Sequence, residues 1–169
     1  MDPVKLIKGR SVLIVDDEED VLEELVGLLD MCKLDTASSF EEGKARLENE
    51  EVNYDVAILD IMGVRGFELL AIAKAYKVPA LMLTAHALTE ESLKRSAEEG
   101  AAYFVPKEEM TNIHLFVADV IEAREKRMNP WHKLIKRLGG FYDRKFQGTK
   151  WREQEGEYWK ERLDRLSGM

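Results

Sequence analysis

The sequence Ser11-Val12-Leu13-Ile14-Val15-Asp16-Asp17 joins a short apolar run to two adjacent carboxylates. Apolar runs of about four to eight residues with β-branched members are typical of strands that are buried on both faces of a parallel sheet. The run Tyr54–Leu59 ends in the same way at Asp60, and the run Pro79–Leu83 ends at Thr84. The sequence therefore predicts several buried strands, each followed at its carboxyl end by a polar residue.

Segments with helical periodicity lie between these runs. Apolar residues between positions 21 and 29 recur at the spacing of one helix face. Ser39 and Thr89 are predicted to cap the starts of two helices, and Gly100 to end one. The expected elements are helices over residues 19–31, 39–47, 67–75, 89–100 and 111–127, with further strands over residues 33–37 and 102–105. This alternation indicates a parallel sheet with helices on both faces, because crossovers between parallel strands are right-handed.

The polar residues at the strand ends are predicted to meet at one edge of this sheet. They are Asp16 and Asp17 after the first strand, Asp60 after the third, Thr84 after the fourth and Lys107 after the fifth. Open α/β sheets place their binding sites at the carboxyl ends of the strands. A sheet of order 2-1-3-4-5 would make the first and third strands neighbours and would bring the three carboxylates together.

Three carboxylates at close range repel one another unless a cation joins them. Mg²⁺ is the expected cofactor, because it binds carboxylate oxygens and keeps positions for water or a phosphoryl oxygen. One carboxylate can then act as a nucleophile and form an aspartyl phosphate. The metal and the lysine would neutralise charge on the transferring phosphoryl group, and the threonine hydroxyl would donate a hydrogen bond to it.

These residues lie in four short motifs, Leu13-Ile14-Val15-Asp16-Asp17-Glu18, Val56-Ala57-Ile58-Leu59-Asp60, Leu83-Thr84-Ala85 and Pro106-Lys107. In this order the motifs resemble the response regulator receiver domain family, over roughly residues 10–127. The resemblance implies a flavodoxin-like α/β fold with a five-stranded parallel sheet of order 2-1-3-4-5. It also implies a cytoplasmic signalling protein, not an enzyme, that accepts a phosphoryl group from a histidine kinase or a phosphotransfer protein.

The resemblance assigns the phosphoacceptor and the metal ligands. Asp60 is expected to accept the phosphoryl group. Asp17 is expected to bind Mg²⁺ directly, with Asp16 assisting through water and Asp60 as a further ligand. The backbone carbonyl of Met62, two residues after the acceptor, would complete the ligands from the protein.

The resemblance also assigns phosphoryl-binding and switch residues. Thr84, Ala85 and Lys107 are expected to bind the phosphoryl group. Thr84 and Phe104 are expected to form a switch pair, in which the hydroxyl moves toward the phosphate and the ring turns inward. The chain departs from the family pattern in having a shorter loop after the acceptor, and in having Pro106 before the lysine and no proline after it. These departures remove none of the site residues.

The residues from Lys126 onward differ in charge from the rest of the chain. They include 12 basic and 6 acidic residues, whereas the preceding part holds 13 basic and 27 acidic residues. We predict a receiver domain over residues 1–127 and a helical extension over residues 128–169, with one helix from Asn129 to Gly139-Gly140 and another over residues 150–166. Three alternatives are open for this extension: packing on the acidic receiver, contact with a partner or second copy, and binding to nucleic acid or a membrane surface.

The composition limits the classes of function. Hydrophobic residues make up 45% of the chain, which is enough for a packed core. Cys32 is the single cysteine, which excludes an internal disulfide, and no apolar run approaches the roughly 20 residues that span a bilayer. The leading hypothesis is a phosphoacceptor receiver that signals through a downstream protein partner, with a homodimer left open. The alternatives are a pseudo-receiver binding module and, less favoured, a DNA-binding regulator that uses the basic extension.

Overall fold

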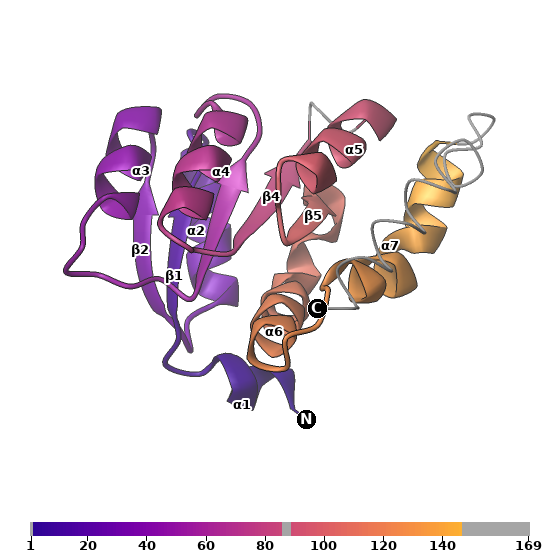
Figure 1. The fold of residues 1–169 in the computed structure, drawn as a ribbon, viewed down its shortest axis with the longest axis horizontal. Coiled ribbons are helices and arrows are strands. Elements are labelled where there is room, and N and C mark those ends of the chain that lie inside the picture. Colours follow the sequence, from indigo (N-terminus) through magenta and orange to yellow (C-terminus); the bar gives the residue numbers. More distant parts are fainter. Residues whose placement is uncertain (1, 86–88, 147–169) are drawn as a thin grey trace.

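A computed structural model describes residues 2–85 and 89–146 of the chain and is built on a five-stranded parallel sheet (Figure 1). The strands are β1 (Ser11–Val15), β2 (Lys33–Ala37), β3 (Val56–Asp60), β4 (Ala80–Thr84) and β5 (Tyr103–Pro106). Their order is β2-β1-β3-β4-β5, with every neighbouring pair parallel. The predicted fold class and strand order are therefore confirmed, and β5 is an edge strand.

Helices cover both faces of the sheet. They are α1 (Pro3–Ile7), α2 (Glu19–Leu28), α3 (Phe40–Leu47), α4 (Gly66–Ala75), α5 (Glu90–Glu98), α6 (Ile113–Glu125), α7 (Trp131–Lys145) and a 3₁₀ helix, η1 (Lys107–Asn112). Helices α3, α4 and α5 lie on one face, and α2 and α6 lie on the other (Figure 1). Strands β3 and β4 are buried at every position, as their continuous apolar runs predicted.

Two predicted helix starts are confirmed by their hydrogen bonds. The Ser39 hydroxyl accepts from the backbone N–H of Glu42 at 3.1 Å, and the Thr89 hydroxyl accepts from that of Ser92 at 3.0 Å. Helix α1 was not predicted. It is only five residues long, which is too short to show a helical period, although it begins in the ordinary way with Asp2 as its cap and a proline at its first position.

Helix α7 corrects one prediction. It was expected to end at Gly139-Gly140 but continues to Lys145. Two glycines inside a helix cost about 1 kcal/mol each relative to alanine. Burial on both sides of the pair opposes this cost, because Leu138 is 3% exposed and Tyr142 is fully buried. The helix predicted over residues 150–166 lies outside the described residues, and the domain boundary at residue 127 stays a prediction.

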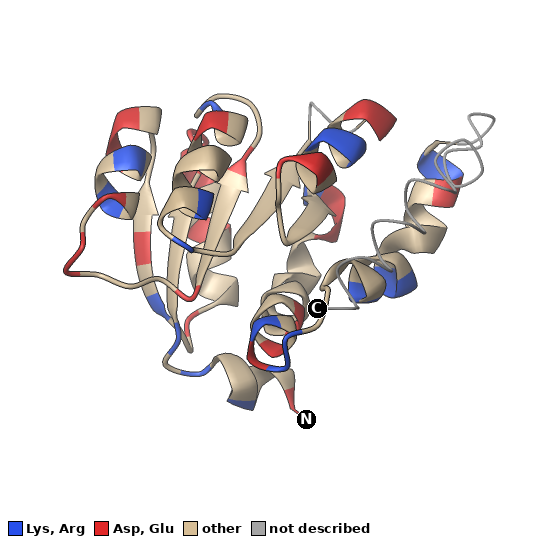
Figure 2. Ribbon diagram, viewed as in Figure 1, with Lys and Arg blue, Asp and Glu red and all other residues tan. Residues whose placement is uncertain are grey.

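The buried side of α7 joins the core of the α/β body. Its apolar residues in this core are Trp131, Leu134, Leu138, Tyr142 and, just past its end, Phe146. The charged residues of α7 and of the turn that precedes it are mostly basic, whereas the other elements carry acidic and basic residues together (Figure 2). Up to residue 146, the extension therefore packs on the body of opposite charge, which was one of the three alternatives. Within the described ranges, no helix is both long and apolar enough to cross a bilayer.

Two glycines test the packing of α2 and α4, because alanine substitutions at these positions are expected to change the free energy of unfolding in opposite directions. Gly27 lies exposed in α2, and an added Cβ would meet nothing within 4 Å. Gly66 begins α4, and an added Cβ would lie 2.2 Å from the carbonyl oxygen of Asp60. We expect Gly27→Ala to raise the free energy of unfolding by about 0.5–1 kcal/mol. We expect Gly66→Ala to lower it by about 2 kcal/mol or more, because backbone atoms must move. Urea denaturation measures both, and a Gly66→Ala variant as stable as the wild type would contradict the described packing.

Candidate functional site

A single ammonium group lies between carboxylates from two neighbouring strands. Lys107, just after β5, places its Nζ 3.0 Å from Asp16 Oδ2 and 3.5 Å from Asp60 Oδ1. Asp16 directly follows β1 and is fully buried, and Asp60 ends β3 and is 5% exposed. Parallel pairing of β1 with β3 brings the two strand ends together. The structure thus unites three of the predicted site residues in one ion-pair cluster, in which both aspartates are buried and the lysine is partly buried.

Two further acidic residues extend this cluster. Asp16, Asp17 and Glu18 offer carboxylate oxygens that all lie within 4.8 Å of one another. Glu18 also places Oε1 3.1 Å from the Lys107 Nζ, and its backbone N–H donates to Asp16 Oδ1 at 2.8 Å. Sequence reasoning gave Glu18 no role, although it is the third member of an acidic run. The contact joins residues 89 positions apart in the chain, so no local pattern indicates it.

The loop after β3 packs closely against Asp17. Gly63 has a φ of +90°, and a Cβ added there would lie 2.4 Å from Asp17 Oδ1. A residue with a side chain would be strained at this φ and would displace the carboxylate. The neighbouring Met62 side chain is 53% exposed. That its backbone carbonyl is a metal ligand stays a prediction.

The remaining predicted site residues follow β4 and β5. Thr84 is the last residue of β4 and is 1% exposed, and Ala85 follows it at the surface. Phe104 in β5 is fully buried, with its ring centroid 6.0 Å from that of Tyr142 in α7. The roles assigned to these residues stay predictions, but Thr84 lies at the carboxyl edge of the sheet as expected. The peptide bond after Lys107 is trans, as are all the described peptide bonds.

Crowded negative charge shifts the titration of the site. Burial, together with the charges of Asp16 and Asp17, raises the pKa of Asp60 to about 7, and Lys107 opposes this shift. Burial likewise raises the pKa of Asp16. Desolvation lowers the pKa of Lys107, but its carboxylate partners outweigh this effect and the net shift is upward. The site therefore holds more negative charge than one ammonium neutralises.

The donor atoms of this cluster suit a hard divalent cation. Oxygen ligands from carboxylates are those that Mg²⁺ selects in proteins. Asp16 Oδ2 is buried, and among the described residues it accepts no hydrogen bond of good geometry, although the Lys107 ammonium lies beside it. A buried carboxylate oxygen that accepts no hydrogen bond can bind a further cation. The residues present therefore fit a magnesium ion.

Comparisons with known proteins agree on one family. The model of the response regulator receiver domain matches residues 12–117. The chain is 31% identical over 131 residues to the two-component response regulator ARR18 of Arabidopsis thaliana. This match covers 72% of this chain and 20% of ARR18. It is 37% identical over 101 residues to the heme response regulator HssR of Staphylococcus haemolyticus. This second match covers 56% of this chain and 43% of HssR. The chain thus spans less than half the length of both curated relatives.

Solved structures show the same fold. A CheY-like receiver domain protein from Methanospirillum hungatei superposes with a TM-score of 0.62 at 26% identity, covering 70% of this chain and 98% of that one. A receiver domain from Clostridium thermocellum also gives a TM-score of 0.62, at 24% identity, covering 70% of this chain and 99% of that one. The family match runs from β1 into α6 and includes the whole ion-pair cluster. The chain therefore belongs to the response regulator receiver domain family of two-component systems.

Proposed function

We propose that this receiver accepts a phosphoryl group on Asp60, in a reaction that depends on Mg²⁺, from a phosphohistidine of a histidine kinase or a phosphotransfer protein. The observation that carries this proposal is the contact of one partly buried ammonium, Lys107 Nζ, with the buried carboxylates of Asp60 and Asp16 at the carboxyl edge of the sheet. Asp60 ends a fully buried strand, so its carboxylate is held in place by the core. The protein's output would be contact with a downstream partner.

The cation would be held by Asp16, Asp17 and Asp60, with the Met62 carbonyl as a further ligand. When bound, it would neutralise negative charge on the transferring phosphoryl oxygens. The packing of Gly63 against Asp17 keeps this carboxylate in a fixed position next to the loop. Glu18 shares Lys107 with Asp16, so it is placed to compete for the ammonium when the charges in the site change.

In the transfer step, a carboxylate oxygen of Asp60 attacks the phosphorus atom of the donor. The new P–O bond forms as the P–N bond of the phosphohistidine breaks, and the imidazole nitrogen keeps the electron pair and takes a proton from solvent. The Lys107 ammonium pairs with the phosphoryl oxygens, while the Thr84 hydroxyl and the Ala85 N–H donate to them. Hydrolysis reverses the modification: water attacks the phosphorus and releases inorganic phosphate and the free carboxylate.

The structure offers less support for nucleic-acid binding by the extension. Arg137 and Lys133, two of the basic residues of α7, pair with the acidic residues Asp119 and Glu122 of α6. The buried apolar residues of α7 pack in the core of the receiver. The described part of the extension is therefore built for contact with protein.

Phosphorylation itself gives the first test of the proposed function. We expect the wild-type chain, treated with acetyl phosphate and Mg²⁺, to gain the mass of one phosphoryl group, and Asp60→Asn to gain none. The exposed Asp30 is the matched control, and Asp30→Asn should label like the wild type. Intact-mass spectrometry measures all three proteins. Absence of label on the wild type would favour the pseudo-receiver, and label on Asp60→Asn would place the acceptor elsewhere.

The raised pKa of Asp60 predicts a cost in stability that depends on pH. Its pKa of about 7 in the folded state lies above the value of about 3.9 for an unperturbed aspartate. Between these values the folded state binds more protons than the unfolded state, so this group's contribution to stability falls as the pH rises. Without metal, we expect Asp60→Asn to be more stable than the wild type by about 1–3 kcal/mol at pH 8.

Urea denaturation in a chelating buffer at pH 5 and pH 8 tests this expectation. The stability advantage of Asp60→Asn over the wild type should be larger at pH 8, and Asp30→Asn is the matched control for loss of an exposed carboxylate. Adding Mg²⁺ at pH 8 should stabilise the wild type more than Asp60→Asn, because binding to the folded state alone raises stability. A stability advantage of equal size at both pH values would show that ionisation of Asp60 does not destabilise the folded state.

A further inference from the structure

Helix α7 contacts the strand that leads into the site. It lies along the outer side of β5 (Figure 1). The Tyr142 hydroxyl donates to the backbone carbonyl of Phe104 at 2.8 Å, and the Tyr142 and Phe104 rings pack against each other. Near the other end of α7, the Trp131 indole N–H donates to the carbonyl of Ala101 at 2.8 Å. Side chains of α7 therefore bind the backbone both before β5 and within it.

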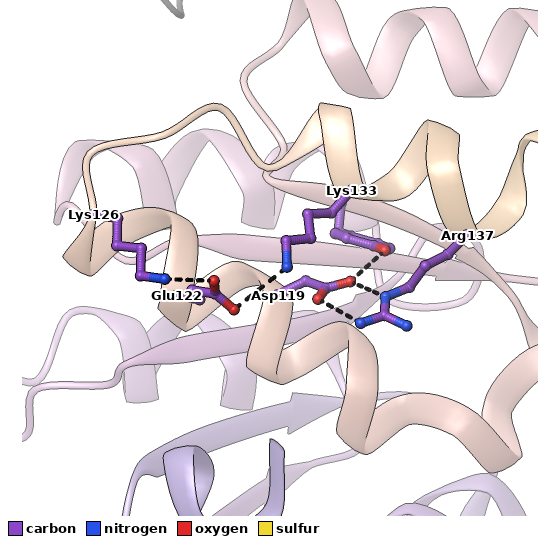
Figure 3. Close-up of polar contacts among 6 residues, drawn as sticks. Asp119, Glu122, Lys126, Lys133 and Arg137 are labelled. Carbon is purple, nitrogen blue, oxygen red and sulfur yellow. Dashed lines mark hydrogen bonds and ion pairs between the residues drawn. The ribbon is translucent and has the colours of Figure 1, made fainter. Parts of the chain in front are cut away.

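A buried carboxylate of α6 joins the same elements. Asp119 is 2% exposed and accepts from Arg137 Nε at 2.6 Å and from Arg137 Nη2 at 3.1 Å. Asp119 also accepts from the hydroxyl of Tyr103, the first residue of β5, at 2.9 Å. Figure 3 shows Arg137 approaching Asp119, with Lys133 near Glu122 on the next turn of α6. We call Ala101, Phe104, Asp119 and Glu122 together the α7 seat.

The α7 seat is close in sequence to the ammonium of the site. Phe104 precedes Lys107 by three residues, and β5 ends at Pro106. Lys107 is shared by Asp16, Glu18 and Asp60, and a phosphoryl group on Asp60 would add about −1.5 to −2 charges beside it by analogy with other phosphorylated residues. Movement of Lys107 toward that group would displace the end of β5, on which both the hydrogen bond and the ring contact of Tyr142 depend.

Helix α7 is weak as an isolated helix. Its 15 residues include the adjacent pair Gly139-Gly140. Isolated helices shorter than about 12–15 residues have marginal stability even in alanine-rich sequences, and α7 is at this limit and contains two glycines. Away from the α7 seat, this helix would lose its hydrogen-bonded turns, and its apolar residues would no longer cover the seat. Seating and helix formation are therefore one process, which can be followed by amide exchange.

On the basis of the proposed function, we propose that the α7 seat is a docking surface for a basic, aromatic amphipathic helix, occupied by α7 itself until phosphorylation of Asp60 releases it. The resident helix shows what the surface binds: aromatic and aliphatic side chains on one face, with an arginine aimed at Asp119. A partner helix of this chemistry binds only when α7 has left. Because coupling between two sites is reciprocal, weakening the seated state also favours the phosphorylated state.

Hydrogen exchange of the full chain, followed by mass spectrometry, tests the release. The phosphoryl mimic is beryllofluoride with Mg²⁺, and Asp60→Asn receives the same treatment as a control. We expect peptides from residues 131–145 of the wild type to exchange about 10-fold faster or more with the mimic, while peptides from α3 keep their rate. Unchanged protection of residues 131–145 in the loaded wild type overturns the inference.

A matched pair of tyrosine variants tests the coupling. Tyr142→Phe keeps the ring and removes the donor to the Phe104 carbonyl, whereas Tyr76→Phe makes the same change at the exposed end of α4. We expect Tyr142→Phe to speed exchange in residues 131–145 without the mimic and to tighten beryllofluoride binding by about 5-fold or more. Tyr76→Phe should change neither. Equal or weaker beryllofluoride binding by Tyr142→Phe overturns the coupling between α7 and the site.

Failure of this inference can be told apart from failure of the proposed function. If acetyl phosphate labels Asp60 and residues 131–145 stay protected in the loaded protein, the proposed function stands and α7 is a fixed part of the receiver. If acetyl phosphate does not label the wild type, the proposed function is wrong, and the phosphorylation-dependent release fails with it.

Discussion

The contact of Lys107 with buried carboxylates is the constraint on which the rest of the structure depends. Like charges delivered by neighbouring strands would separate if their backbones could move, and a single ammonium offsets only part of their repulsion. The three central strands prevent this separation because they are enclosed by helices and fixed by pairing on both sides. The core thus stabilises an arrangement of charge that opposes folding, and such a balance is typical of functional sites.

The same lysine links the site to the surface of the molecule. It follows directly from β5, and β5 holds a fully buried residue against each face of the sheet: Tyr103 packs on Phe116 of α6, and Phe104 packs on Tyr142 of α7. A short strand that is packed on both faces has few conformations, so a shift of the backbone at its end is passed on to the helices that contact it. The charge cluster, the edge strand and α7 therefore form one connected unit.

The sequence predicted the features that depend on local pattern. Strands β3 and β4 were recognisable because burial on both faces requires an unbroken apolar run, and the site was recognisable because a polar residue ends each run. What depends on distant contacts was hidden. Glu18 received no role from the sequence, because its contact with Lys107 joins residues 89 positions apart. Gly139-Gly140 looked like a helix end because the propensity of glycine is local, whereas the burial of Leu138 and Tyr142 is tertiary.

The position of α7 on an edge strand has a consequence for assembly. Edge strands and the surfaces beside them are where copies of a protein commonly pair, and a covering helix blocks such pairing. With α7 seated, a helix of the same chain covers the outer side of β5 and opposes association of two copies there. Association there would need α7 to leave, or to exchange with the same helix of the second copy, as in domain swapping. The concentration of the protein would then act on the same equilibrium as its modification, because mass action draws the unseated form into the dimer.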